Sequence, residues 1–260
     1  MAIRRDQDIP RIASIWYGGD MKKILVTIVL FAASCSLAFA SYDEALKNFQ
    51  ENKFRDALEV IAAELSVEKD MVQNSPNYAL RFLAAHCHWK LGNTESAVAH
   101  FKRCAEIRRD TVDPFTDHSL MLLELGRYRE AEGIATRALA VRKDPMLYYL
   151  IGRAAYGVGN FWRAKEFYEK ALAADPALYI AYNGLGCALM RLGKFTHANT
   201  AFSAALANAP SSPEILNNIG RSLEKMGKHK EAASYYGKAL KLRPDNQTIA
   251  QNLSRVAEKK

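Results

Sequence analysis

The residues with the most reactive side chains gather in one short stretch, His86-Cys87-His88. Imidazole and thiolate groups are ligands of zinc and partners in nucleophilic catalysis. On a helix, however, successive residues point about 100° apart, so His86 and His88 diverge and cannot converge on one metal ion. His100 and Cys104 share a helix face, but two ligands do not make a structural metal site. The sequence therefore predicts no metal, no cofactor and no catalysis.

The helices that carry these residues are predicted by a repeat of 34 residues. Three stretches superimpose at this spacing, and each holds a packing glycine, a turn glycine, an aromatic residue and a closing proline. The three sets are Gly152, Gly159, Tyr168 and Pro176; Gly186, Gly193, Phe202 and Pro210; and Gly220, Gly227, Tyr236 and Pro244. Such periodicity indicates stacked copies of one helical hairpin, none of which can bury its apolar face alone. In the copy that starts at Tyr179, we expect helices from Tyr179 to Leu192 and from Thr196 to Ala209.

This pattern of an aromatic, Leu-Gly, a turn glycine, small alanines, aromatics and a closing proline resembles the tetratricopeptide repeat. The resemblance implies an all-α protein, a right-handed α-solenoid of tandem helical hairpins with a C-terminal capping helix. We expect this domain to span 41–260, and its repeat at 112 is one residue short. Leu253 and Ala257 of the capping helix are expected to face the preceding repeat. The expected parts are a degenerate hairpin 42–65 with Ala57 at its crossing, a loop 66–77, repeats 78–111, 112–144, 145–178, 179–212 and 213–246, and the cap 247–260.

The N-terminal part of the chain predicts an export signal at 21–40. Met21-Lys22-Lys23 is followed by an apolar run, Ile24–Ala33, and by Ala38-Phe39-Ala40, the order of a bacterial signal peptide cleaved after Ala40. The apolar run is too short to span a bilayer. We therefore expect a periplasmic protein, and we interpret residues 1–20 as an over-extended start.

Cys35 allows a second interpretation of the same segment. A cysteine that ends an apolar run can be the lipidated residue of a membrane-anchored lipoprotein, although Ala32-Ala33-Ser34 lacks the leucine that such a site usually carries. Lipidation would hold the protein on a membrane surface through acyl chains. Without it, we expect no membrane contact.

Charge and cysteine content narrow the partners. The chain carries a net charge of +8, yet the export signal argues against nucleic acid and favours an acidic peptide or another anionic partner. The cysteines that would remain after cleavage are Cys87, Cys104 and Cys187, an odd number that does not make a disulfide framework. We expect Cys87 and Cys104 to be unpaired core thiols.

The resemblance also implies a binding surface. In this family the first helices line a concave groove through positions 2, 5, 9, 12 and 13 of the repeat. Here those positions are aromatic in the N-terminal half and rich in amide and cationic groups in the C-terminal half, which could pair with a peptide backbone and with carboxylates. The candidate partner-binding residues are Phe82, Trp89, Tyr149, Arg153, Tyr156, Asn183, Arg191, Asn217, Arg221, Lys225 and Arg255.

These observations favour an exported, non-catalytic scaffold that binds a protein or peptide with a carboxylate or acidic segment and assembles a cell-envelope complex. A lipid-anchored assembly factor of the pilus or secretin type is the alternative that depends on Cys35. A small-ligand module is the third, built around His86, Trp89, Tyr156 and Cys187. The simplest alternative is a solvated groove that binds nothing, with Trp89 and Met190 half-buried between repeats.

Overall fold

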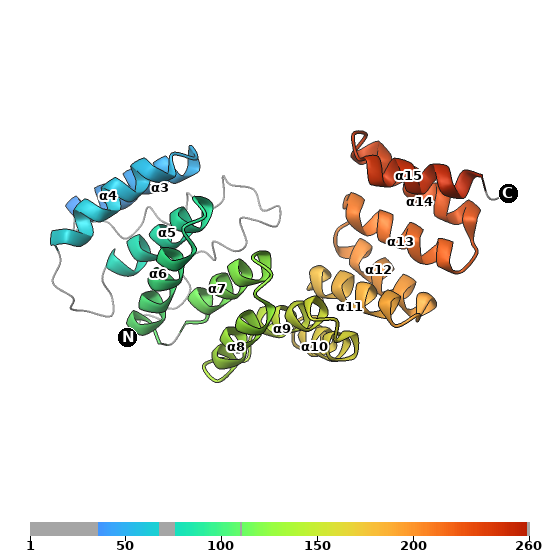
Figure 1. The fold of residues 1–260 in the computed structure, drawn as a ribbon, viewed down its shortest axis with the longest axis horizontal. Helices are drawn as coiled ribbons and strands as arrows, with labels where there is room; N and C mark the ends of the chain where they lie inside the picture. Colours follow the sequence, from blue (N-terminus) through green and yellow to red (C-terminus); the bar gives the residue numbers. More distant parts are fainter. Residues whose placement is uncertain (1–35, 68–75, 110, 259–260) are drawn as a thin grey trace, which may run out of the picture. The chain divides into compact units, whose positions relative to one another are not determined.

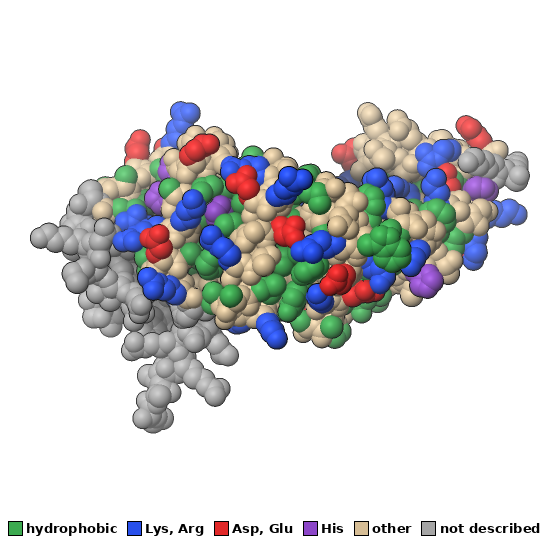
Figure 2. Space-filling view, turned by 60° about the horizontal axis from the view of Figure 1, so that its bottom comes forward, with side chains coloured by type: hydrophobic (Ala, Val, Ile, Leu, Met, Phe, Trp, Pro, Cys, Tyr) green, Lys and Arg blue, Asp and Glu red, His purple; other side chains and the backbone are tan. Residues whose placement is uncertain are grey.

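The computed structural model describes residues 36–67, 76–109 and 111–258, which form α-helices joined by turns, with no strand in those ranges (Figure 1). The predicted all-α fold of tandem helical hairpins is confirmed. Hydrophobic side chains lie among lysine, arginine and acidic side chains on the surface (Figure 2). The predicted extension 1–20 and most of the predicted signal, 21–35, lie outside the described residues; the first described helix starts at Ser36. None of the described helices is long and apolar enough to cross a bilayer.

The chain divides into two compact units at Met121 and Leu122, within α7 (Asp113–Glu124). The first unit contains two hairpins and the start of α7. Each hairpin packs its two helices together, and the first hairpin packs against α5 of the second. Ala57, at the predicted crossing of the first hairpin, is fully buried. The two hairpins are α3 (Ser36–Gln50) with α4 (Phe54–Val67), and α5 (Pro76–Lys90) with α6 (Thr94–Ile107).

The second unit contains three complete hairpins between α8 and a last single helix. Each helix packs against the next along the chain. We call the leading helix of a hairpin its first helix and the other its second helix. The elements are α8 (Tyr128–Leu139), α9 (Pro145–Gly157), α10 (Phe161–Ala174), α11 (Tyr179–Arg191), α12 (Phe195–Asn208), α13 (Pro213–Lys225), α14 (His229–Leu242) and α15 (Gln247–Ala257).

The turn within each hairpin depends on a residue in the left-handed conformation. Gly193 has φ = 72° and Gly227 has φ = 76°, values that glycine adopts without a steric penalty. Asn52, with φ = 61°, takes the same role in the degenerate first hairpin. Gly126 and Gly159 are separated by 33 residues, whereas the other turn glycines are 34 apart, which confirms that one repeat is a residue short. The second helices end two residues before Pro176, Pro210 and Pro244, as predicted.

The two helices of a hairpin cross at a glycine that faces an aromatic ring. A Cβ atom added at Gly220 would lie 2.6 Å from Tyr236 Cε1, and one added at Gly152 would lie 2.8 Å from Tyr168 Cδ1. Gly186 faces Phe202 in the same way. These rings are almost fully buried. Glycine is therefore required at this position because any side chain would occupy the space of the ring.

Three boundaries and one helix face differ from the prediction. The first hairpin, expected to start at residue 42, begins at Ser36, within the segment expected to be the signal. The loop expected at 66–77 is shorter, because α4 continues to Val67 and α5 begins at Pro76. The capping helix is confirmed, and Leu253, although only partly buried, packs against the core as predicted. Ala257 is exposed, and Ile249 and Val256 complete the buried face in its place. Asn246 caps α15 by accepting a hydrogen bond from Ile249 N, which fixes the start of the helix and hence its buried face.

Replacement of Gly220 by alanine tests the crossing. We expect Gly220→Ala to lower the free energy of unfolding by about 1–3 kcal/mol, because the methyl group overlaps the Tyr236 ring. Gly237→Ala is the matched control, since a Cβ there meets nothing within 4 Å. That change should stabilise α14 by about 0.5–1 kcal/mol through helix propensity alone. Urea unfolding measures both, and equal effects of the two variants would contradict the close crossing.

Candidate functional site

The first helices of the second unit form one continuous face. α9, α11, α13 and α15 contact one another in that order. Asparagine side chains join neighbouring helices of this row: Asn218 Nδ2 donates to Asn183 Oδ1 at 3.0 Å, and Asn252 Nδ2 donates to Asn217 Oδ1 at 2.9 Å. The same bond therefore recurs between the fifth position of one repeat and the sixth position of the next. This asparagine ladder fixes which side chains lie beside each other on the face.

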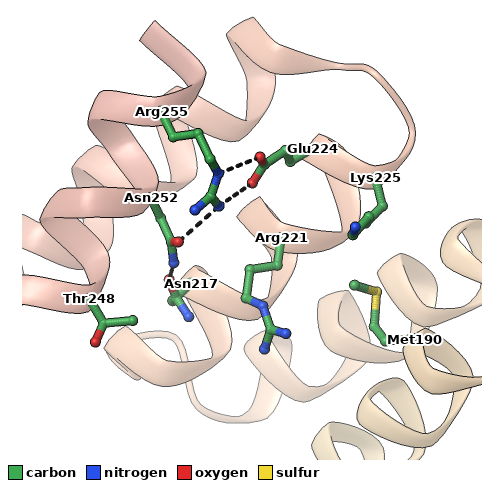
Figure 3. A pocket seen from close by; sticks show the side chains of 8 residues that line it. All are labelled: Met190, Asn217, Arg221, Glu224, Lys225, Thr248, Asn252 and Arg255. Atoms are coloured by element: carbon green, nitrogen blue, oxygen red, sulfur yellow. Dashed lines mark hydrogen bonds and ion pairs between the residues drawn. The ribbon is translucent and has the colours of Figure 1, made fainter. Parts of the chain in front are cut away.

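A pocket of about 580 Å³ lies on this face (Figure 3). Its walls come from α11, α13 and α15, and they contain three cationic side chains against one carboxylate. Of the predicted binding residues, Asn217, Arg221, Lys225 and Arg255 are brought together here. The lining residues are Met190, Asn217, Arg221, Glu224, Lys225, Thr248, Asn252 and Arg255.

One cation of the pocket is already neutralised. Arg255 donates to both oxygens of Glu224, from Nε at 2.8 Å and from Nη2 at 2.7 Å, and Nη2 also donates to Asn252 Oδ1 at 2.9 Å. The Tyr236 hydroxyl donates to Glu224 Oε2 at 3.0 Å. Burial, followed by the hydrogen bond to Glu224, raises the pKa of Tyr236 above its usual value. Arg255 therefore ties α15 to α13, which corrects the prediction that its guanidinium is available to a partner.

The other two cations have no such partner. Arg221 and Lys225 are exposed, and within the described residues neither forms an ion pair with a carboxylate. Figure 3 shows the Arg221 side chain extending away from the Arg255–Glu224 pair. The carbonyl of Asn217 is used in the ladder, so only its Nδ2 end remains for another acceptor. The pocket therefore carries more positive than negative charge.

Repeat geometry explains why Arg221 is left without a carboxylate. Arg255 follows Glu224 by 31 residues, and Arg221 follows Met190 by the same interval. The two arginines hold equivalent places in successive repeats, as do Glu224 and Met190. Because a thioether cannot neutralise a guanidinium, the substitution of methionine for glutamate leaves Arg221 with its full charge.

Two predicted binding residues are in the core and not on an open surface. Phe82 is 3% exposed and packs edge to face against Phe101, with ring centroids 6.0 Å apart. Tyr149 is 8% exposed and lies beside Tyr168. Both occupy the fifth position of a repeat, where the expected groove residue turns inward because an aromatic ring can fill the space between hairpins. Neither ring is presented to a partner.

The remaining predicted residues contact neighbours of their own. Trp89 is half-buried beside the ring of His86 at 5.7 Å, within the first unit. Arg153 lies over the ring of Tyr149 at 5.9 Å.

Tyr156 and Arg191 both contact Phe161 at the hairpin turn. Tyr156 meets the ring edge to face at 5.3 Å, and the Arg191 guanidinium lies over it at 4.5 Å. Asn183 takes part in the ladder. These residues do not gather in the pocket.

His86 and His88 diverge, as their helical spacing predicts. His86 is buried and lies 3.1 Å from Asp117 Oδ2 through Nε2, whereas His88 stacks on His100 with centroids 5.4 Å apart. The two imidazoles therefore point to different neighbours. In the described parts of the chain, no three His, Cys, Asp or Glu side chains are placed to hold a metal ion.

The three cysteines that the structure describes are free, and Cys87 and Cys104 are fully buried in different apolar clusters, which confirms the prediction of core thiols. Burial raises the pKa of the thiols of Cys87 and Cys104 to about 12, and it raises the pKa of Cys187 to about 11. All three are therefore protonated at neutral pH and are poor nucleophiles or metal ligands.

The predicted binding residues left out four residues that line the pocket, Met190, Glu224, Thr248 and Asn252, and the ladder residue Asn218. The repeat spacing contained a signal for two of them, because Asn218 and Asn252 are 34 residues apart. They occupy the sixth position, where the preceding repeat has Gly184, packed against Tyr168.

Comparison with known families decides the classification. Two models described as tetratricopeptide repeat match the chain, one at residues 78–111 and the other at 116–179 and 183–247, which together exceed half of its length. The chain belongs to the tetratricopeptide repeat family. A comparison with curated protein sequences found no match.

Solved structures with the same fold are tetratricopeptide repeat proteins of low sequence identity. One is PilW, described as a widely conserved type IV pilus biogenesis factor, with 17% identity and a TM-score of 0.69 over 86% of this chain and 100% of that chain. Another is MamA from Desulfovibrio magneticus RS-1, with 22% identity and a TM-score of 0.56 over 66% and 98% of the two chains. A third is YrrB, described as having an unusual peptide-binding site, with 18% identity and a TM-score of 0.53 over 68% and 91%. At these identities the likeness establishes the fold.

The Arg255–Glu224 pair should hold the last helix of the repeat array in place. In Glu224→Gln the amide offers one acceptor where the carboxylate offers two, so we expect amide hydrogen exchange in α15 to accelerate by about tenfold, equivalent to about 1.4 kcal/mol. Exchange measured by mass spectrometry on peptides from 247–257 reports this directly. Glu231→Gln is the control, because its partner Lys228 lies 3.3 Å away on an exposed surface and contributes little. Unchanged exchange in Glu224→Gln would show that α15 is held by its apolar face alone.

Proposed function

We propose that this protein is a non-catalytic scaffold that binds a partner protein through the pocket on α11, α13 and α15. The family acts in protein–protein interaction, and the pocket supplies the chemistry. The observation that carries the proposal is the pair of exposed cations, Arg221 and Lys225, which have no carboxylate partner among the described residues. A peptide segment with acidic side chains or a terminal carboxylate would supply the missing charge.

The type of anion follows from the donors. The Arg221 guanidinium can fork onto a carboxylate, Lys225 adds a second positive charge, and Asn217 Nδ2 can donate to a backbone carbonyl. Met190 at the edge of the pocket offers a deformable apolar contact. An acidic, extended segment with one apolar side chain satisfies all four groups. The YrrB structure shows that a tetratricopeptide repeat protein of this fold has a peptide-binding site.

We further propose that the scaffold works in the bacterial cell envelope, as an exported periplasmic protein. The basic start, apolar run and Ala-x-Ala of 21–40 support export. A lipid-anchored form that assists pilus or secretin assembly is the second candidate. It is supported by Cys35 and by the likeness in fold to PilW, a pilus biogenesis factor.

Removal of the two cations tests the pocket. Arg221→Ala combined with Lys225→Ala should reduce capture of partners from an envelope extract of the source bacterium by about tenfold or more, because two charge-assisted contacts are lost. Both side chains are exposed, so the unfolding midpoint should not change. Lys238→Ala with Lys241→Ala removes the same charge from the outer surface of α14 and should leave capture unaffected. Quantitative mass spectrometry of the captured proteins is the measurement.

A second variant keeps both cationic side chains but adds a carboxylate beside one of them. Met190→Glu recreates beside Arg221 the arrangement of Glu224 and Arg255, so capture should fall as it does in the double variant. If partners bind the unmodified chain, the double variant and Met190→Glu equally well, the pocket is not the binding site.

The mature N-terminus separates the two forms of export. Intact-mass analysis of the protein purified from a bacterial host should show Ser41 as the first residue, because the Ala-x-Ala site directs cleavage after Ala40. A diacylated N-terminal Cys35 would establish the lipoprotein instead. Cys35→Ser is the control, since it should change the product only if lipidation occurs. A product that still begins before residue 21 would contradict both forms.

A further inference from the structure

We propose a second docking surface on this protein, at the hairpin turns of the second unit, that binds an acidic protein segment carrying an apolar side chain. We call it the turn patch and define it by Val158, Phe161, Trp162, Arg191 and Lys194. It shares no lining residue with the pocket on α11, α13 and α15. It therefore goes beyond the function proposed above and stands without it.

The turn patch contains two exposed hydrophobic side chains. Trp162 is 60% exposed, the highest value among the large hydrophobic residues that the structure describes, and Val158 is 50% exposed. Trp162 lies in the first turn of α10, directly after the turn that contains Gly159. Exposed tryptophan contributes nothing to the core, and apolar surface gathered with charged groups is typical of interaction sites.

Two cations are held against these aromatic rings. The Arg191 guanidinium lies 4.5 Å from the centroid of Phe161, and Lys194 Nζ lies 4.4 Å from that of Trp162. Arg191 is the last residue of α11, and Lys194 directly precedes α12. Two neighbouring rings on the hairpin of α9 and α10 are therefore each covered by a cation from the hairpin of α11 and α12. Tyr156 also packs against Phe161, edge to face at 5.3 Å. The arrangement is preorganised, because both rings and both cations sit at the ends of helices.

These cations differ from their neighbours on α10 in having no carboxylate. Arg163 pairs with Glu132 at 2.6 Å, Lys165 pairs with Glu169 at 2.7 Å and Lys170 pairs with Glu166 at 2.6 Å. Within the described part of the chain, Arg191 and Lys194 form no ion pair with a carboxylate. The outer surface of α10 is therefore electrically balanced, whereas the turn patch carries two positive charges beside exposed apolar groups.

Charge complementarity identifies the partner as an acidic protein segment. Arginine and tryptophan are the residue types that contribute most to protein–protein binding energy, and both are present here. A bilayer is a poorer fit, because two exposed apolar side chains give little area to insert. A second copy is disfavoured by like charge, since the chain has a net charge of +8. One apolar side chain packed on Trp162 and Val158, with carboxylates at Arg191 and Lys194, satisfies the patch.

The test uses the full chain and a fluorescein-labelled peptide in which one Phe is flanked on both sides by Asp and Glu. The C-terminus of the peptide is amidated, so that it offers no terminal carboxylate. Fluorescence anisotropy gives the Kd. Trp162→Ala, and separately Arg191→Glu with Lys194→Glu, should each raise the Kd by about tenfold or more. A peptide with Lys in place of every acidic residue should not bind.

A matched control distinguishes the turn patch from general positive charge. Lys238→Glu with Lys241→Glu makes the same change of charge on α14, where Lys238 also lies over an aromatic ring, that of Tyr235 at 4.9 Å. This variant should keep the Kd within about twofold of the unmodified chain. Arg221→Ala with Lys225→Ala should also keep it, which separates this surface from the pocket.

Four results would overturn the proposal. The first is a Trp162→Ala protein that binds the peptide as tightly as the unmodified chain. The second is loss of binding in the Arg221→Ala, Lys225→Ala protein, which would place the peptide in the pocket. The third is a dimer in sedimentation that Trp162→Ala dissociates, because a second copy would then be the occupant. The fourth is tighter, Trp162-dependent binding to phosphatidylglycerol vesicles than to the peptide.

Discussion

The close crossing of two helices over a glycine is the constraint on which the rest of the second unit depends. Tyr168 lies between Gly152 of its own hairpin and Gly184 of the next, and a Cβ atom at either glycine would come within 2.8 Å of the ring. One buried aromatic therefore sets the separation within a hairpin and the separation between hairpins. Because the helices cannot slide without moving this ring, the side chains of successive first helices are brought into a fixed register.

The register explains how the amides are used. Asn183 and Asn217 are residues of the type expected to bind a peptide. Their side-chain carbonyl oxygens, however, accept hydrogen bonds from Asn218 on α13 and Asn252 on α15, the next first helices of the row. Part-buried amides that bond each other satisfy their own polar groups and hold the first helices together. The groups that the ladder does not use are the charged ends of the long side chains and the exposed aromatic ring of Trp162, and these are the groups to which we assign recognition in our proposals.

The sequence predicted the features that repeat and missed those that depend on one neighbour. Turn glycines, crossing glycines and closing prolines follow from backbone sterics, so their spacing was sufficient to place the hairpin helices of the second unit within two residues. The burial of Phe82 and Tyr149 depends on how tightly adjacent hairpins pack, which a position number within the repeat does not express. The same limit applies to the buried face of α15. There Val256 is buried in place of the predicted Ala257, its neighbour in the sequence. The pairing of Arg255 with Glu224 could not be predicted without knowing that side chains 31 residues apart lie beside each other on neighbouring helices.

The residue at one repeat position, Glu224 or Met190, decides whether the arginine of the next repeat is held in an ion pair or is left exposed. Where the position holds Glu224, the arginine of the next repeat forms a bidentate pair and stabilises the end of the array. Where it holds Met190, the equivalent arginine, Arg221, keeps its charge and faces the pocket. The backbone is the same in both cases, so the choice costs the fold little. A repeat protein can thus acquire an anion-binding site by losing one carboxylate, without adding any cation. The turn patch follows the same rule. Arg163 and Lys170 of α10 lie over the ring of Phe167 and also pair with glutamates, whereas Arg191 and Lys194 lie over aromatic rings and form no ion pair with a carboxylate within the described part of the chain.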